Sequence, residues 1–176
     1  MVQLDDVTGP NYLDGLETWS LADVRARRDE ATEVETGLSY LRRMVQGRLD
    51  IVLAEQHRRQ TGEGSGDVAD LVDRLPAILG DHVHAPGIGR LPALMGPGQV
   101  DAGLAARLEE VLPAARLGSL PDMNDVHLAT AASGLDQIER SVSSQRRAVF
   151  DVLDRMQEEI VRRYRSGEAT VDSLLP

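Results

Sequence analysis

The sequence predicts an all-α protein built around a long antiparallel coiled-coil helical hairpin, with short helices in the connecting region. Two stretches of about forty residues contain no proline and repeat apolar residues every seven positions. Only 3% of the 176 residues are aromatic, which disfavours a β-sandwich or barrel. Hydrophobic residues make up 41% and charged residues 27% of the chain. This balance is typical of a folded protein and not of a disordered one.

The first long helix is expected over residues 20–60. Ser20 and Asp23 have the spacing of a capping box at its start. Apolar residues then recur in heptad fashion, which predicts a coiled-coil seam that Arg27, Arg48 and Glu55 interrupt. The seam consists of Val24, Ala31, Val34, Leu38, Leu41, Val45 and Val52.

The second long helix is expected over residues 122–167 and closes at Gly167. Its seam consists of Leu135, Ile138, Val142, Val149, Val152 and Met156. Each apolar stripe would face water if its helix stood alone, so we expect the two helices to pack on each other. Two long helices of similar length, joined by a compact region, favour an antiparallel hairpin.

The remaining segments are expected to be less regular. Residues 1–19 contain scattered glycine, proline and aspartate and predict a flexible N-terminal lead-in. Residues 61–121 predict a linker with two short helices, at about 67–79 and 101–112, separated by a loop rich in glycine and proline. Residues 168–176 are left as a C-terminal tail.

Composition excludes several classes of function. The chain has no cysteine, so it forms neither a disulfide framework nor a zinc–thiolate site, and we expect no metal. Its net charge of −10 disfavours direct binding to nucleic acid and suits a basic protein partner. No apolar run is long enough to span a membrane, and the N-terminus does not resemble a signal peptide. We therefore expect a cytoplasmic protein with no membrane partner.

A polar pattern occurs on both long helices at an offset of 104 residues. At about 100° per residue, its side chains fall within an arc of roughly 80° beside the apolar seam. Phe150 stands where the second copy would place the glutamine. The pattern consists of Glu35, Ser39, Arg42, Gln46 and Asp50 on the first helix and Glu139, Ser143, Arg146 and Asp154 on the second.

These side chains match the edges of a guanine nucleotide. A carboxylate accepts from the N1–H and N2–H₂ donors of guanine, and arginine donates to its O6 and N7 atoms. Arginine also pairs with phosphate and stacks on a base. Two related stripes can hold a two-fold symmetric ligand or two copies of one ligand.

The pattern E-x3-S-x2-R-x3-Q-x3-D resembles the cyclic di-GMP-binding signature of the RsiG family of anti-sigma factors. It is complete from Glu35 to Asp50, and the second copy departs from it only at Phe150. The resemblance implies an antiparallel coiled coil that binds cyclic di-GMP as a dimer of the nucleotide. It also implies that the loaded protein sequesters WhiG, a sporulation sigma factor similar to flagellar-type sigma factors, and keeps it from RNA polymerase.

Two alternatives come from other functional classes. The polar stripes are also compatible with the solvated flanks of a nucleotide-independent coiled-coil adaptor or scaffold protein. A small helical enzyme is disfavoured, because the chain contains no recognisable grouping of a nucleophile with a base. The residues do not decide whether Phe150 packs on a purine or on the partner helix.

Overall fold

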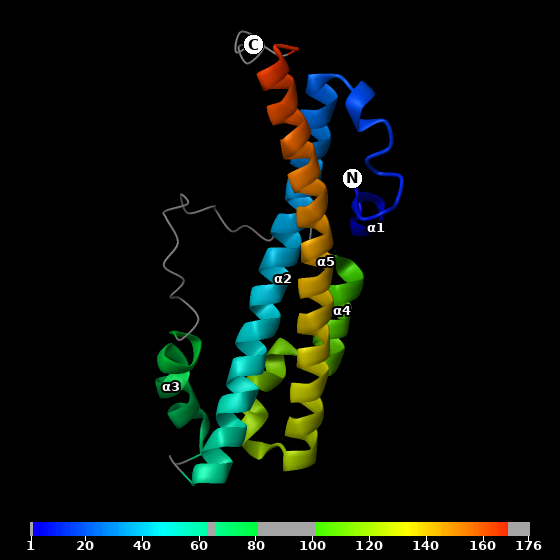
Figure 1. Ribbon diagram of the computed structural model, residues 1–176. Coiled ribbons are helices and arrows are strands. Elements are labelled where there is room, and N and C mark those ends of the chain that lie inside the picture. The colour runs from blue at the N-terminus through cyan, green and yellow to red at the C-terminus, as the bar shows by residue number, and fades with distance from the viewer. Residues whose placement is uncertain (1, 63–65, 81–100, 169–176) are drawn as a thin grey trace.

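The computed structural model describes residues 2–62, 66–80 and 101–168, and all regular structure in these ranges is helical. Two long helices, α2 (Leu21–Thr61) and α5 (Asp125–Ser166), lie side by side and run in opposite directions (Figure 1). The shorter elements are α1 (Leu4–Val7), η1 (Leu16–Thr18), α3 (Val68–Gly80), α4 (Ala102–Val111) and η2 (Ala114–Asp122), where η marks a 3₁₀ helix. The predicted glycine- and proline-rich loop and most of the C-terminal tail lie outside the described residues.

Side-chain caps and glycines fix the ends of the long helices. The predicted capping box forms: the Asp23 backbone N–H donates to Ser20 Oγ at 3.1 Å, and the Ser20 N–H donates to the Asp23 carboxylate at 3.3 Å. Asn124 is the N-cap residue of α5, as Ser20 is of α2, and its side chain accepts a hydrogen bond from the first turn of the helix. Gly62 and Gly167 end the two helices with φ of 71° and 79°, a left-handed conformation that glycine adopts without strain.

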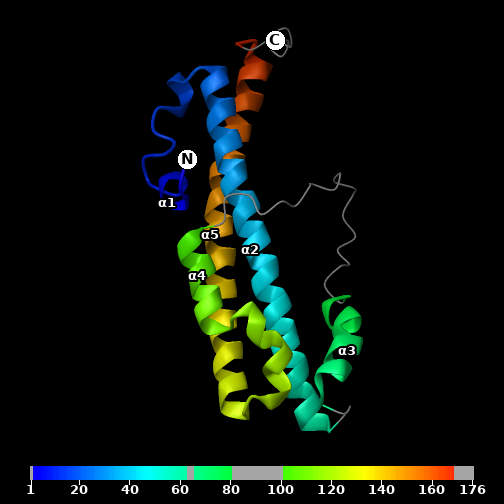
Figure 2. The same cartoon turned by 180° about the vertical axis from the view of Figure 1, so that it is seen from behind.

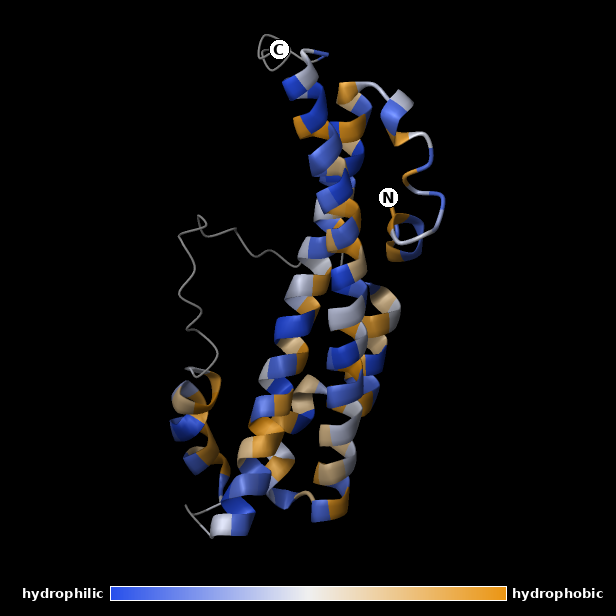
Figure 3. Cartoon of the chain, in the orientation of Figure 1, coloured by the Kyte–Doolittle hydropathy of each residue, from blue (hydrophilic) through white to orange (hydrophobic). Residues whose placement is uncertain are grey.

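The predicted apolar seams form the core between α2 and α5. Hydrophobic and hydrophilic residues alternate along both helices, as expected when one face packs and the other meets solvent (Figure 3). Each fully buried leucine or valine contributes about 1.5–3 kcal/mol through apolar burial. In the described residues, no helix has the length and hydrophobicity needed to cross a bilayer. The buried seam residues are Val24, Ala31, Val34, Leu38, Leu41, Val45 and Val52 on α2, and Leu128, Leu135, Ile138, Val142, Val149 and Met156 on α5.

The connecting elements pack on the two long helices, with α4 against α5 and both α3 and η2 against α2 (Figure 2). Arg48, which interrupts the α2 seam, is buried because it binds the end of α4. Its Nη1 donates to the Leu112 carbonyl at 2.6 Å and its Nη2 to Glu109 at 2.5 Å. A charged residue inside the seam thus anchors a connecting helix, and its burial is compensated by these partners.

The N-terminal segment differs from the flexible lead-in that the sequence suggests. Leu4 and Val7 of α1 are buried in the main core. The Arg27 guanidinium lies 4.2 Å from the centre of the Trp19 ring, and the Tyr12 hydroxyl donates to the Arg27 carbonyl at 3.1 Å. The apolar residues of this segment are too few and too irregularly spaced to show a helical period, which is why the sequence does not reveal its packing.

Near its C-terminal end, each long helix carries a glutamate that binds two arginines of its own helix. Glu55 is 2% exposed and accepts from Arg58 and Arg59 at 2.7–2.8 Å. Glu159 is 7% exposed and accepts from the next two arginines on α5 at 2.5–2.8 Å. The hydrogen bonds of Arg162, followed by those of Arg163, lower the pKa of Glu159 from 4.5 to about 2. Those of Arg58 and Arg59 lower the pKa of Glu55.

We expect Glu159→Gln to lower the free energy of unfolding by about 1–3 kcal/mol at pH 7, because it removes a carboxylate that two arginines stabilise. A group whose pKa is lower in the folded state contributes stability above its ordinary pKa and loses that contribution as the pH falls. The difference between wild type and variant should therefore be complete above about pH 5 and should shrink as the pH falls from 4.5 toward 2. Urea denaturation at a series of pH values measures it.

Glu158→Gln is the matched control, since it removes the same charge from the exposed adjacent position. Its effect on unfolding should stay within about 0.5 kcal/mol at pH 7. An equal loss of stability in both variants would contradict the role given to Glu159.

Candidate functional site

The repeated polar residues of α2 and α5 lie at the edge of the contact between these helices. Glu35, Ser39, Arg42 and Gln46 of α2 are all half-buried, and so are the matching residues of α5. This intermediate burial follows from their position beside the apolar seam, where one side of the side chain meets the partner helix and the other meets solvent.

The first group, which we call the Arg42 half-site, combines residues of both helices. Arg42 Nε of α2 donates to Glu139 Oε1 at 3.0 Å and to Ser143 Oγ at 2.8 Å, both on α5. Ser143 Oγ also donates to Glu139 Oε1 at 3.0 Å, and Gln46 Nε2 donates to the same oxygen at 3.2 Å. One carboxylate oxygen therefore collects donors from three side chains.

The second group, the Arg146 half-site, has the same arrangement with the helices exchanged. Arg146 Nε of α5 donates to Glu35 Oε1 and to Ser39 Oγ of α2, both at 2.8 Å. Ser39 Oγ donates to Glu35 Oε1 at 2.6 Å. Reciprocal contacts of this kind are what a local two-fold axis between antiparallel helices produces. Each group thus combines the arginine of one helix with the glutamate and serine of the other.

Within the described residues, each half-site keeps its outward groups without a hydrogen-bond partner. Both arginines use Nε for the contacts across the helices, which leaves Nη1 and Nη2 as donors. Both glutamates accept through Oε1, which leaves Oε2 as an acceptor. The side chains of Arg42 and Arg146 are 35% and 32% exposed, so these groups can be reached from solvent. Each half-site offers a fixed guanidinium next to a carboxylate.

The two half-sites differ at one position. Gln46 adds a hydrogen bond to Glu139 in the Arg42 half-site. Its counterpart Phe150 instead lies under the Arg146 guanidinium, 4.7 Å from the ring centre, in a cation–π contact. This contact links two residues that lie four positions apart on the same helix, so the aromatic ring supports Arg146 where the other half-site has an amide.

A family model described as RsiG-like matches residues 10–79 of the chain. This match identifies residues 10–79 as an RsiG-like region. The match begins after α1 and covers all of α2 and most of α3, so it includes the complete copy of the polar pattern. The match suggests a regulatory, anti-sigma role. No curated protein matches the chain.

Some of the predicted site residues of this RsiG-like chain lie outside the reciprocal network. Asp50 is half-buried and lies about 12 Å beyond Arg42 along α2. Asp154 is exposed at the same separation from Arg146 along α5. Arg43 and Arg147, adjacent to the two central arginines, are exposed on the surface.

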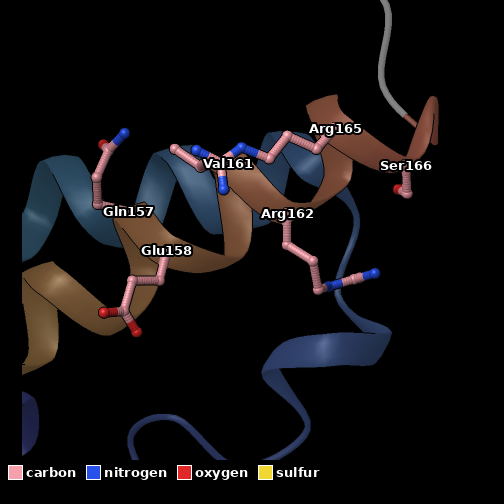
Figure 4. Close-up of a pocket in the computed structure, with 6 residues that line it drawn as sticks. All are labelled: Gln157, Glu158, Val161, Arg162, Arg165 and Ser166. Atoms are coloured by element: carbon pink, nitrogen blue, oxygen red, sulfur yellow. The ribbon is translucent and has the colours of Figure 1, made fainter.

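In the described part of the chain, no three His, Asp or Glu residues form a group that could hold a metal ion. A shallow depression near the end of α5 is lined by side chains that point in different directions and do not converge on one point (Figure 4). The lining residues are Gln157, Glu158, Val161, Arg162, Arg165 and Ser166.

Sequence reasoning missed the second polar repeat of this RsiG-like chain, the pattern E-x2-R-R. It lies at the offset of 104 residues already seen for the first pattern, with Glu55 matching Glu159. Extending that alignment by about two and a half helical turns beyond Asp50 would have found it. The pairing of Arg42 with Glu139 could not have been found in this way, because an offset along the chain carries no information on which residues face each other.

We expect Arg146 and Glu35 to be energetically coupled by about 0.5–1 kcal/mol, because their partly buried ion pair is supported by Ser39. A double-mutant cycle with Arg146→Met and Glu35→Gln, followed by urea denaturation without ligand, measures this coupling.

The control cycle uses Asp136 and Arg140, an exposed pair on α5 at 2.7 Å. Its coupling should not exceed about 0.5 kcal/mol. A coupling between Arg146 and Glu35 no larger than that of the control would argue against a fixed network between the helices.

Proposed function

We propose that this RsiG-like protein is a cytoplasmic anti-sigma factor that binds cyclic di-GMP along an antiparallel coiled coil formed by α2 and α5. When loaded, it sequesters a WhiG-type sigma factor and keeps it from RNA polymerase. The observation that carries the proposal is the pair of reciprocal half-sites, in which the motif residues of both helices come together with their outward groups accessible.

The chemistry of one half-site supports guanine as the recognised base. The free Oε2 of Glu35 or Glu139 is an acceptor for N1–H and N2–H₂, and the Nη groups of the adjacent arginine are donors for O6, N7 or phosphate. Adenine lacks the N2 amino group and carries a donor in place of O6. A carboxylate next to an arginine therefore favours guanine over adenine.

The symmetry of the site supports a two-fold symmetric ligand. Cyclic di-GMP contains two equivalent halves, and a dimer of the nucleotide contains four. The Arg42 and Arg146 half-sites are related by the exchange of α2 and α5. A ligand that contacts both half-sites would bind side chains of both helices at once.

The charge of the chain supports a basic protein partner. The net charge is −10 and the isoelectric point is about 4.8. A sigma factor contacts promoter DNA through basic surfaces, which an acidic partner can cover by charge complementarity. Nucleotide dependence requires that the ligand binds the sequestering state more tightly than the free state, or that it forms part of the interface.

A nucleotide-independent scaffold is the second candidate, and one observation favours it. Within each half-site the arginine and glutamate already satisfy part of each other's hydrogen-bonding capacity. A scaffold needs nothing more from these residues than that contact. The two candidates differ in whether the outward Nη and Oε2 groups bind a ligand.

Isothermal titration with cyclic di-GMP, with and without a WhiG-type sigma factor, distinguishes the candidates. We expect saturable binding, and we expect Arg42→Ala and Arg146→Ala each to weaken it by about 10–100-fold, the effect of removing one charged hydrogen-bonding group. Helicity measured by circular dichroism should be nearly unchanged, because neither arginine lies in the apolar seam.

Arg43→Ala is the matched control, since it removes the same charge from an exposed neighbouring position. It should change the dissociation constant by much less than Arg42→Ala. Cyclic di-AMP is the ligand control and should not bind at the same concentrations. Absence of binding at micromolar protein, both with and without the sigma factor, would favour the scaffold.

Sequestration is tested by size-exclusion chromatography of the protein with the sigma factor. A complex should form in the presence of cyclic di-GMP and dissociate when the nucleotide is removed. Rising salt should slow its formation, because attraction between an acidic and a basic surface is screened. A complex that forms equally well without nucleotide would contradict the proposed switch.

A further inference from the structure

Arg59 extends from the C-terminal end of α2 to the backbone that leads into α5. Its Nη2 donates to the carbonyl of Leu120 at 3.0 Å and to that of Pro121 at 3.1 Å. Its Nη1 donates to the carboxylate of Asp125, the first residue of α5, at 2.7 Å. One side chain thus fixes the end of one long helix to the beginning of the other.

Arg163 makes the corresponding connection at the opposite end of the helix pair. Its Nη1 donates to the carbonyl of Trp19 at 2.6 Å and its Nη2 to that of Leu16 at 2.8 Å, just before α2 begins. Leu16 and Leu120 are themselves separated by 104 residues, as are Arg59 and Arg163. The two connections are therefore related by the same exchange of helices as the two half-sites. We call Arg59 and Arg163 the end arginines.

A buried carboxylate orients each end arginine. Arg59 Nε donates to Glu55 at 2.7 Å, and Arg163 Nε donates to Glu159 at 2.5 Å. The Nε of each guanidinium therefore binds a glutamate of its own helix. Its Nη groups donate to the backbone that leads into the other long helix. A planar guanidinium is well suited to such fixed, multiple donation, which an ammonium group cannot reproduce.

The half-sites require an accurate axial register between α2 and α5. Arg42 lies 17 residues before Arg59, and Arg146 lies 17 residues before Arg163, which corresponds to about 25 Å in each case. A shift of one residue would move a side chain by about 1.5 Å along the axis and rotate it by about 100°. The contacts of 2.8–3.0 Å across the helices would not survive such a shift.

We propose that the end arginines are positioning residues for the nucleotide site. They fix α2 and α5 at both ends, and this register assembles the Arg42 and Arg146 half-sites about 25 Å away. The apolar seams alone hold the helices together less specifically, because heptad-spaced valine and leucine residues also allow shifted alignments. This inference rests on the proposed function for its ligand, cyclic di-GMP.

Titration of Arg59→Ala and Arg163→Ala with cyclic di-GMP tests the proposal in the full chain. The matched controls are Arg58→Ala and Arg162→Ala, which remove a cation from the same glutamates without removing the connection to the other helix. We expect the end-arginine variants to bind about tenfold more weakly and the controls to bind within about twofold of wild type. Unchanged binding by Arg59→Ala and Arg163→Ala, or equal weakening in the controls, would overturn the proposal.

A second readout needs no ligand. The chain has no cysteine, so Met44→Cys and Ser144→Cys, both at exposed positions, provide two unique sites for spin labels on α2 and α5. The distribution of label distances should be narrow in the otherwise unchanged protein and in the Arg58→Ala control, and broad with Arg59→Ala. An equally narrow distribution with Arg59→Ala would overturn the proposal.

The label distances also separate failure of this inference from failure of the proposed function. If the wild-type protein does not bind cyclic di-GMP, the proposed function fails, and the distances still show whether the end arginines set the register. If Arg59→Ala does not fold, Arg59→Lys replaces it, because lysine keeps the charge near Glu55 but cannot make all the contacts of Arg59. The Arg59→Lys variant should stay helical and still broaden the distribution of label distances. A narrow distribution in this variant would count against the proposal.

Discussion

The axial register between α2 and α5 is the constraint on which the rest of the molecule depends. Apolar burial supplies most of the attraction between the two helices, but it is insensitive to small displacements along the axis. Polar contacts are short and directional, and they distinguish one register from the next. In this protein such contacts occur in the middle of the helix pair and near both of its ends.

The sequence was sufficient to predict features that depend on local periodicity. The seven-residue spacing that includes Leu38 and Val142 identified both buried seams, and the capping box at Ser20 marked where the first long helix begins. It did not predict that α1 packs into the core, because four residues are too few to show a period. The burial of Arg48 was also unforeseen, since its partners lie about sixty residues away in the chain.

The candidate site shows the same division between local and long-range information. Spacing alone placed Glu35, Ser39 and Arg42 on one side of the first long helix. The repeat placed their counterparts on one side of the second long helix. It suggested two separate stripes, whereas the structure combines the arginine of each helix with the glutamate and serine of the other. Which residues of α2 and α5 face each other depends on how the two helices pack. The sequence pattern of each helix does not specify this packing. The resemblance to the RsiG family indicated the residues but not their pairing.

The difference between Gln46 and Phe150 has a consequence for how such a protein would respond to its signal. Two ligand molecules, one at each half-site, would meet unequal surroundings, one with an additional amide and one with an aromatic ring beneath the arginine. Unequal sites fill at different ligand concentrations, unless binding at one strengthens binding at the other. If the two half-sites filled independently, the occupancy of the protein would rise over a wider range of ligand concentration. A species with one half-site occupied would then form. A difference at one position between the two copies of the pattern would thus change the steepness of a dose response without altering the fold.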